Sequence, residues 1–256
     1  MTVPDVLICS GLDPSGGAGF LADARIIHLL GGRPVGVITA QTVQSTTGMR
    51  SSHEVEREVF GEQLNALLTD IEVKAVKLGL LGSQGIVEEL GQQLSLTAAP
   101  LVWDPIAGPT RGDGGGGKEL LGFALRELGR HLTLITPNTN ELALLTGGSV
   151  STLAEATAAA RALADFAKVA VLLKGGHLGT EHSVDVLCHS GGTQEFVGPR
   201  FAGEDVHGTG CALSSAIATY LALGVPLADA CRRAKDVVAE RIMKPVRPGR
   251  GAPAIV

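Results

Sequence analysis

A glycine-rich turn at residues 205–211 (Asp-Val-His-Gly-Thr-Gly-Cys) stands directly before a long apolar stretch at 212–223. Gly208 and Gly210 let backbone N–H groups converge where the predicted helix begins, and the helix dipole adds positive potential there. Such a site can stabilise the charge that develops on a transferring phosphoryl group. A simple helix cap, in which glycine only supplies the turn, explains the same residues equally well.

Lys174 is a second candidate for phosphate chemistry. It follows the apolar run 169–173 and precedes two glycines, so its ammonium group is expected at the end of a buried strand. Most lysines are solvated surface residues, but this position is unusual for one of those. We expect Lys174 to reach a phosphate group.

Two other glycine patterns resemble nucleotide motifs but lack a required residue. Residues 17–22 fit the dinucleotide pattern, yet the segment 37–41 holds no acidic residue to bind a ribose. Residues 112–118 fit GxxxxGK, but Glu119 stands where a P-loop needs Ser or Thr for magnesium. An NAD-linked oxidoreductase is therefore disfavoured, and we expect the glycine-rich run 112–117 to be a flexible loop.

The elements that must position these residues can be read from alternating apolar patterns. Short runs with few charges predict strands buried on both faces, at 6–9, 35–39, 75–78, 100–103, 132–135 and 169–173. Amphipathic stretches predict helices at 21–30, 54–68, 153–166 and 212–223. Residues 183–187 and 194–197 predict a late antiparallel hairpin.

This alternation predicts an α/β protein with right-handed crossovers and a mainly parallel central sheet flanked by helices, with a small antiparallel edge. No linker interrupts it, so we expect one domain over residues 1–256. In such a sheet, ligands bind where the strands end. The glycine clusters and Lys174 follow predicted strands, which favours a single site there.

Composition narrows the function classes. The 256 residues include 35 glycines, 45% are hydrophobic, and the formal net charge is −5. With few aromatic residues and a pI near 5.8, a nucleic-acid partner is not expected. No apolar stretch has the roughly 20 residues that span a bilayer, and residues 6–9 are too short for a signal peptide. We expect a cytoplasmic enzyme with four free cysteines.

Several motifs occur together in a familiar order. They are the segment 11–19 (Gly-Leu-Asp-Pro-Ser-Gly-Gly-Ala-Gly) with Asp23, Gln44, residues 77–79, Asp104-Pro, residues 136–141 (Thr-Pro-Asn-Thr-Asn-Glu), residues 173–177 (Leu-Lys-Gly-Gly-His) and residues 207–211 (His-Gly-Thr-Gly-Cys). Over residues 6–240 the chain resembles the hydroxymethylpyrimidine/phosphomethylpyrimidine kinases of thiamin biosynthesis. The resemblance implies a three-layer ribokinase-like fold, ATP and Mg²⁺ as cofactors, a small pyrimidine substrate, and a homodimer.

The resemblance also implies roles for the phosphate-side residues. It implies that the loop of Gly208, Thr209, Gly210 and Cys211 stabilises the negative charge of the transition state, and that Lys174 binds a phosphate group. A thiol at a helix start has a lowered pKa, so Cys211 is expected to accept the substrate proton. The alternative is that only its backbone N–H matters.

For ATP and Mg²⁺, the resemblance implies Asn138 and Glu141, with Asp104 as a further metal ligand. Asn138 and Glu141 also fit a helix-capping pair, and both roles are compatible. For the pyrimidine it implies Gly11, Asp23 and Gln44, with Leu80 and Ile106 as apolar walls; without that context, Asp23 and Gln44 would be surface residues. We expect His177 and His207 to order loops, and Lys77, Cys9, Cys231, His182 and His189 to serve structure or face solvent.

The sequence departs from the family pattern at three places, of which the C-terminal segment 244–251 resembles the family's ending only loosely. The segment 107–113 (Ala-Gly-Pro-Thr-Arg-Gly-Asp) replaces the usual Met-x-x-Lys-Ser-Gly-Asp, so Arg111 is expected to stand in for the lysine. Asp205 puts a carboxylate beside the phosphate site, where it could disfavour a substrate that is already phosphorylated. A pyridoxal kinase of the same fold, and a pyrimidine- or nucleotide-binding regulatory protein without turnover, remain alternatives.

Overall fold

The computed structural model describes residues 3–107, 117–176, 182–201 and 203–256. Within them one sheet forms the centre of the molecule, with the strand order β3-β2-β1-β4-β5-β6-β7-β8-β9. The strands are β1 Asp5–Leu12, β2 Arg33–Ser45, β3 Gly48–Glu54, β4 Ala75–Leu78, β5 Leu101–Trp103, β6 Leu134–Ile135, β7 Ala170–Leu173, β8 His182–His189 and β9 Gly192–Pro199.

The direction of the strands confirms the mainly parallel sheet. The six strands from β2 to β7 in this order pair in parallel, which needs a crossover between each pair. The predicted late hairpin is also confirmed, because β8 and β9 pair antiparallel to each other, and β8 also pairs antiparallel to β7. The opposite edge carries a second antiparallel strand, β3, which the sequence analysis did not anticipate.

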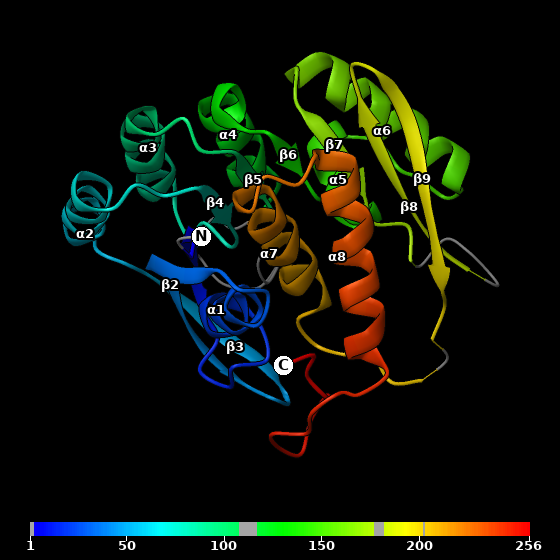
Figure 1. The fold of residues 1–256 in the computed structure, drawn as a ribbon, viewed down its shortest axis with the longest axis horizontal. Helices are drawn as coiled ribbons and strands as arrows, with labels where there is room; N and C mark the ends of the chain where they lie inside the picture. Colours follow the sequence, from blue (N-terminus) through cyan, green and yellow to red (C-terminus); the bar gives the residue numbers. More distant parts are fainter. Residues whose placement is uncertain (1–2, 108–116, 177–181, 202) are drawn as a thin grey trace.

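Helices cover both faces of the sheet (Figure 1). One face carries α1 Gly19–Leu29, α7 Thr209–Ala222 and α8 Leu227–Ile242, and the other carries α2 Arg57–Asp70, α3 Gln84–Gln93, α4 Lys118–Leu128, α5 Thr139–Thr146 and α6 Leu153–Ala167. Three layers result, as predicted. Short 3₁₀ turns at Leu94–Leu96 and Gly129–His131 complete the described elements.

Strand β1 shows why the apolar runs had few charges. Leu7 and Cys9 pack into the core beneath α2, α3 and α4, while Val6 and Ile8 pack into the core beneath α1, α7 and α8. Because successive side chains of a strand point to opposite faces, a strand covered on both sides must be apolar at every position. The cores therefore sit on both faces of the central strands.

The prediction of a helix at 54–68 was wrong at its start. Residue 54 is the last residue of β3, which pairs along β2, and α2 begins only at Arg57. The buried stripe shifts accordingly: Phe60 is fully buried, whereas Val59 is 42% exposed. Pairing along the neighbouring strand overrides the amphipathic pattern of the sequence at this junction.

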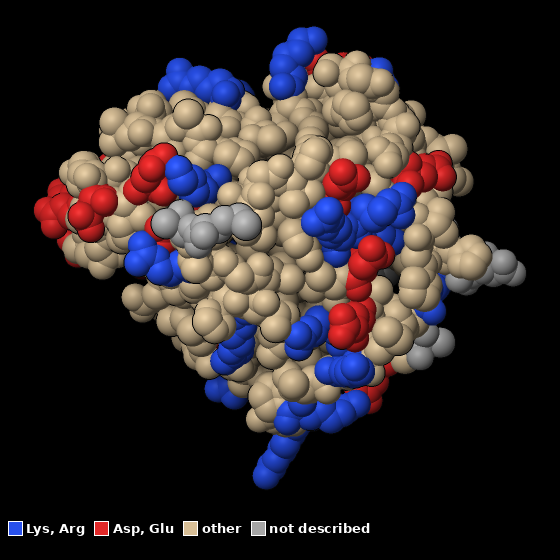
Figure 2. All heavy atoms as spheres, viewed as in Figure 1, with Lys and Arg blue, Asp and Glu red and all other residues tan. Residues whose placement is uncertain are grey.

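No helix in the described part of the chain is long and apolar enough to cross a membrane. Figure 2 shows basic and acidic side chains interspersed over the face that carries α8, without a continuous patch of either sign on that face. The sheet edge where the parallel strands end is therefore the feature that organises a site.

Candidate active site

A cavity of about 970 Å³ opens where the parallel strands end. All predicted site residues except Asp23 line it. They are Gly11, Gln44, Leu80, Asp104, Ile106, Asn138, Glu141, Lys174, Gly208, Thr209, Gly210 and Cys211. Residues up to 200 positions apart thus meet in one place, because each lies at the end of a strand, follows a strand or begins a helix at the same edge of the sheet.

Lys174 is the central cation of this cavity. Its Nζ lies 2.7 Å from Asp104 Oδ1 and 3.4 Å from Glu141 Oε2. Asp104 follows β5 and is almost completely buried, and Thr136 Oγ1 also donates to its Oδ1, at 3.3 Å. The three side chains form a compact group of one ammonium and two carboxylates at the ends of neighbouring strands.

Burial and charge act in opposite directions on this group. Burial by itself lowers the pKa of Lys174, but the adjacent Asp104 and Glu141 outweigh it and raise the pKa above its ordinary value. For Glu141, burial raises the pKa, Lys174 lowers it, and Asp104 raises it again, so the net direction is upward. Lys174 is therefore a permanent cation, and the carboxylates would gain from a further cation beside them.

Asn138 and Glu141 form the capping pair that the sequence predicted. Glu141 N donates to Asn138 Oδ1 at 2.8 Å, and Asn138 N donates to Glu141 Oε2 at 2.7 Å. This reciprocal arrangement begins α5 and satisfies two helix-terminal N–H groups. It also fixes the Glu141 carboxylate so that Oε2 faces Lys174.

The start of α7 faces the same group. Gly208 has φ +87°, and a side chain there would place Cβ 2.0 Å from the carbonyl oxygen of Gly17. At Gly210 a Cβ would lie 3.2 Å from Lys174 Nζ and 3.3 Å from Asp104 Oδ2. Glycine therefore lets the free backbone N–H groups of the helix start approach the cation and carboxylates closely.

The expectation that Cys211 has a lowered pKa is wrong. The thiol is buried, and burial raises its pKa to about 12, with the nearby Lys77 only partly opposing the effect. The helix start cannot compensate for the loss of water around an ionised sulfur. At neutral pH the Cys211 thiol is protonated.

Asp23 does not line the cavity, contrary to the sequence analysis. Its side chain is fully buried, and Lys77 Nζ lies 2.7 Å from Oδ2. Ser10 Oγ donates to Oδ2 at 2.7 Å, and Ser215 Oγ donates to Oδ1 at 2.8 Å. Both carboxylate oxygens are thus occupied by the protein itself, beneath the site.

Lys77 is correspondingly a buried structural residue. Burial lowers its pKa, but Asp23 and the other groups around it raise it above the ordinary value. A lysine within the otherwise apolar strand β4 was a signal for such a buried pair, because an unpaired ammonium would be too costly there. The expected assignment of Lys77 to structure or solvent is thus resolved in favour of structure, with Asp23 as its partner.

Gly11, Gln44, Leu80 and Ile106 also line the cavity. A Cβ at Gly11 would lie 3.0 Å from Leu80 Cδ2, so the backbone of residue 11 lies against this apolar wall. Gln44 contacts His207, whose Nε2 also lies 3.1 Å from Asp13 Oδ2. Asp13, separated from His207 by 194 positions, was not identified from the sequence, since nothing in the spacing links them.

The remaining predictions have mixed outcomes. Asp205 lines the cavity, as expected of a carboxylate near the phosphate site. Arg111, His177 and all of the run 112–117 except Gly117 lie outside the described residues. Burial raises the pKa of the Cys9 and Cys231 thiols to about 12, which is typical of structural cysteines. All four cysteines are free, as expected.

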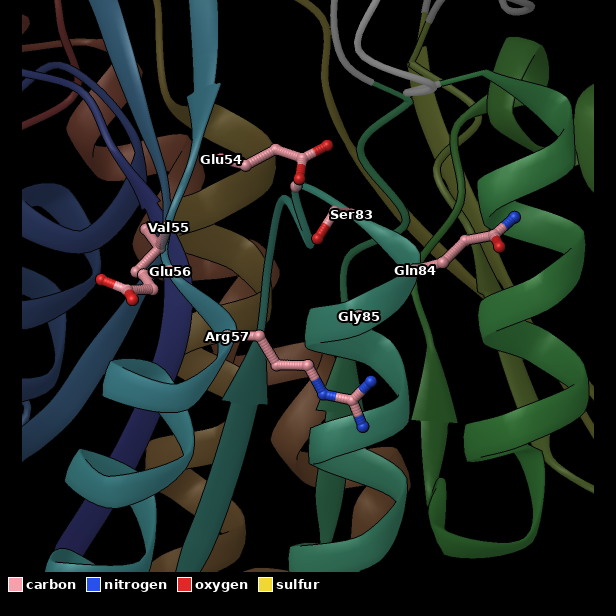
Figure 3. Close-up of a pocket in the computed structure, with 8 residues that line it drawn as sticks. Glu54, Val55, Glu56, Arg57, Ser83, Gln84 and Gly85 are labelled. Atoms are coloured by element: carbon pink, nitrogen blue, oxygen red, sulfur yellow. The ribbon is translucent and has the colours of Figure 1, made fainter.

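A second hollow, of about 660 Å³, lies between the starts of α2 and α3 (Figure 3). Glu54, Glu56, Ser83 and Gln84 line it together with Arg57. Arg57 pairs with Glu88 at 2.6 Å and Glu89 at 3.4 Å, so its charge is already neutralised. None of the predicted site residues line this hollow.

The family model described as phosphomethylpyrimidine kinase matches residues 13–255. The chain belongs to this family. The hydroxymethylpyrimidine/phosphomethylpyrimidine kinase of Mycobacterium tuberculosis is 38% identical over 255 residues, which cover 98% of this chain and 92% of that protein. The thiamine biosynthesis bifunctional protein ThiED of Geobacter sulfurreducens is also 38% identical, but this chain spans only 51% of its length.

Among solved structures, the pyridoxal kinase of Staphylococcus aureus in complex with ADP superposes with a TM-score of 0.91. It is 26% identical, and the match covers 100% of this chain and 94% of that one. The ribokinase-like fold of the phosphomethylpyrimidine kinase family is thereby confirmed. The similar proteins thus include hydroxymethylpyrimidine/phosphomethylpyrimidine kinases and a pyridoxal kinase.

Proposed function

We propose that this chain transfers the γ-phosphoryl group of ATP to the hydroxymethyl group of 4-amino-5-hydroxymethyl-2-methylpyrimidine, and then a second phosphoryl group to the resulting monophosphate. These steps would supply the pyrimidine diphosphate for thiamin diphosphate synthesis. The observation that carries the proposal is one cavity in which Lys174, two carboxylates and a glycine-rich helix start meet. Phosphoryl transfer requires this combination of positioning and charge stabilisation.

In this proposal, the substrate hydroxyl attacks the γ-phosphorus while the bond to ADP breaks, and negative charge gathers on the transferring oxygens. The N–H groups of Gly208, Thr209, Gly210 and Cys211 would stabilise that charge from the start of α7. Lys174 lies within reach of the same position, because Gly210 approaches its Nζ closely. Asn138 and Glu141 would complete the nucleotide side.

Mg²⁺ fits the donor set beside Lys174. Asp104 and Glu141 offer hard carboxylate oxygens, and magnesium usually takes one or two carboxylates together with phosphate oxygens. Burial and the nearby Asp104 raise the pKa of Glu141 although Lys174 opposes them, so a further cation at this place would favour the ionised carboxylate. When bound, the ion would neutralise charge on the phosphates, and Asp104 and Glu141 would hold it.

The substrate hydroxyl must lose a proton, and Cys211 is the proposed acceptor. Because burial raises the pKa of its thiol to about 12, only a small ionised fraction could accept the proton at neutral pH. Lys77, which lies beneath the site and opposes that rise, would stabilise the ionised form. If the thiol takes no part, Cys211 contributes its backbone N–H alone.

The pyrimidine would occupy the part of the cavity lined by Gly11, Gln44, Leu80 and Ile106. The apolar side chains of Leu80 and Ile106 suit the faces of a flat ring. The Gln44 amide offers one donor group and one acceptor. We further propose that residues 1–256 act as one domain, in the cytoplasm, and as a homodimer. Light scattering tests the dimer, which requires twice the 26.2 kDa of one chain.

The test is the rate of ADP release with the pyrimidine alcohol, its monophosphate and pyridoxal in parallel. We expect release with both pyrimidines and a kcat/KM for pyridoxal at least about tenfold lower. ADP release with pyridoxal alone would show that the chain is a pyridoxal kinase instead. The superposition with the Staphylococcus aureus pyridoxal kinase is the reason to include this substrate. Binding without any release would favour a regulatory binding protein.

A further inference from the structure

One nitrogen of His207 links the cavity amide to a buried carboxylate. His207 Nε2 lies 3.0 Å from Gln44 Nε2 and 3.1 Å from Asp13 Oδ2. The three residues come from different segments: Asp13 follows β1, Gln44 is at the end of β2, and His207 precedes α7. All three line the cavity. The protonation of this nitrogen therefore bears directly on what Gln44 presents to a ligand.

Asp13 requires a hydrogen on His207 Nε2. The carboxylate is 3% exposed, and an ionised carboxylate only accepts hydrogen bonds. Its Oδ1 accepts from the backbone N and the Oγ of Ser15, at 2.9 and 2.7 Å, and its Oδ2 accepts from Ala18 N at 3.1 Å. These main-chain contacts fix Asp13 as an acceptor, so the ring nitrogen facing Oδ2 must donate.

The opposite end of the Gln44 amide faces Thr42. The Thr42 hydroxyl donates its single hydrogen to the Leu12 carbonyl at 2.8 Å, so towards Gln44, 3.3 Å away, it can only accept. A protonated Nε2 has no lone pair, so towards the amide end 3.0 Å away it cannot accept and can only share its one hydrogen, whereas Thr42 offers an acceptor. The two ends of an amide have the same shape, so these partners decide its orientation. The carbonyl end belongs on His207 and the NH₂ end on Thr42.

We propose that Asp13 and His207 are positioning residues that hold the Gln44 amide, with its carbonyl sharing the His207 Nε2 hydrogen with Asp13 and its NH₂ group on Thr42. One amide hydrogen then bonds Thr42, and the other is directed to the cavity that Gln44 lines. Gln44 therefore presents a donor, and the ligand must present an acceptor. Under the proposed function, on which this inference rests, that acceptor is an unprotonated ring nitrogen of the pyrimidine.

The backbone holds His207 in place independently of this network. His207 N donates to Pro253 O at 2.8 Å, and Ile255 N donates to His207 O at 3.1 Å. The C-terminal segment that makes these bonds also bonds the turn after β2, through Ala252 N and Thr46 O at 3.0 Å. The imidazole packs against Gly17, where a Cβ would lie 2.7 Å from Cδ2. We therefore expect a flat aromatic ring at position 207 to occupy the place of the imidazole.

This permits a selective test by calorimetric titration without nucleotide, so that binding is measured apart from turnover. The ligands are the hydroxymethylpyrimidine and its two analogues in which one or other ring nitrogen is replaced by CH. For the unaltered chain, we expect the parent to bind about tenfold more tightly than one analogue. His207→Phe keeps the ring and removes the donor, and should reduce that preference to about twofold or less.

Two further variants and one control complete the experiment. His207→Gln carries an amide donor at the distance of Nε2 and should restore most of the preference. Thr42→Val removes the acceptor at the other end and should reduce the preference by a second route, which keeps the inference testable if His207→Phe does not fold. His28→Phe, an exposed histidine on α1, should leave the preference unchanged.

The outcomes separate this inference from the proposed function. If the unaltered chain phosphorylates the pyrimidine but His207→Phe and Thr42→Val retain its ring-nitrogen preference, the positioning role is wrong and the kinase stands. If the preference depends on His207 but ADP is not released, the positioning role stands and the kinase is wrong. A chain that does not bind the pyrimidine at all would overturn both.

Discussion

The ammonium of Lys77 lies 2.7 Å from Asp23 Oδ2, with neither side chain exposed to solvent. This pair connects β4 to α1 directly beneath the start of α7, and Ser215 of α7 donates to the other carboxylate oxygen. Three elements that form the floor of the cavity are thereby held by one charged group. Asp23 is accordingly a structural residue rather than a surface contact for substrate.

Removing either charge of this pair should destabilise the fold strongly. Asp23→Asn or Lys77→Met leaves a buried charge without its partner, which costs about 3–5 kcal/mol of unfolding free energy. The double variant should lose less than the sum of the two single losses. Urea unfolding measures all three. Arg33→Met, which breaks the exposed pair with Asp5, is the control and should change the unfolding free energy far less than either variant of the buried pair. Additive losses would contradict the account.

Gly208→Ala should damage the site more than its backbone conformation alone predicts. Gly208 and Gly31 share φ +87°, but a Cβ at position 208 meets the Gly17 carbonyl, whereas nothing lies within 4 Å at position 31. Gly31→Ala should therefore cost only the ~1–2 kcal/mol of the left-handed conformation and retain turnover. Gly208→Ala should also lower kcat by about 10²-fold, because the helix-start donors are displaced. An equal change in kcat for both variants would show that the start of α7 takes no part in catalysis.

The pH dependence of turnover tests the role of the Cys211 thiol. Its pKa rises from 9.0 to about 12 in the folded chain, so the ionised fraction grows with pH throughout the range 7–9. If the thiolate accepts the proton, kcat at saturating substrates should rise about tenfold per pH unit over this range. Cys211→Ala should lower kcat and abolish that slope. If kcat of the unaltered chain does not change with pH over this range, the thiolate is not the proton acceptor and Cys211 contributes only its backbone N–H.

Magnesium dependence tests the two carboxylates. Chelation of divalent ions should abolish turnover, and Asp104→Asn should raise the Mg²⁺ concentration for half-maximal rate by about tenfold, because one of two carboxylate ligands is lost. Asp70→Asn, at the exposed end of α2, is the control and should leave the magnesium titration unchanged. An unaltered titration for Asp104→Asn would exclude this carboxylate as a metal ligand.

The sequence was most informative about local features. Apolar runs located the parallel strands, and glycine clusters at their ends located the cavity, because both follow from short-range patterns. Asp23 was misplaced because the partners that enclose it, Lys77 and Ser215, lie 54 and 192 positions away. The Cys211 pKa was misjudged for a related reason: a helix start can be read from the sequence, whereas the burial that outweighs it depends on the packed fold.

The same limit explains the contacts that were missed entirely. The Asp13–His207 contact forms only when the loops after β1 and before α7 meet. The spacing of these two residues in the sequence does not predict it. Lys235 and Asp185, which pair at 2.7 Å beside the backbone of Gly175, are a further example. Gly175 N donates to the other oxygen of Asp185 at 3.1 Å, so this pair supports the backbone immediately after Lys174.

The most direct measurement is mass spectrometry of the products formed from ATP and the hydroxymethylpyrimidine by the unaltered chain and by Lys174→Met. The account predicts the pyrimidine monophosphate and then the diphosphate, with both formed at least about 10²-fold more slowly by Lys174→Met, because the cation over the transferring phosphate is lost. Lys74→Met, an exposed lysine before β4, should match the unaltered chain. Absence of any phosphorylated pyrimidine, or equal rates with Lys174→Met, would contradict the central claim.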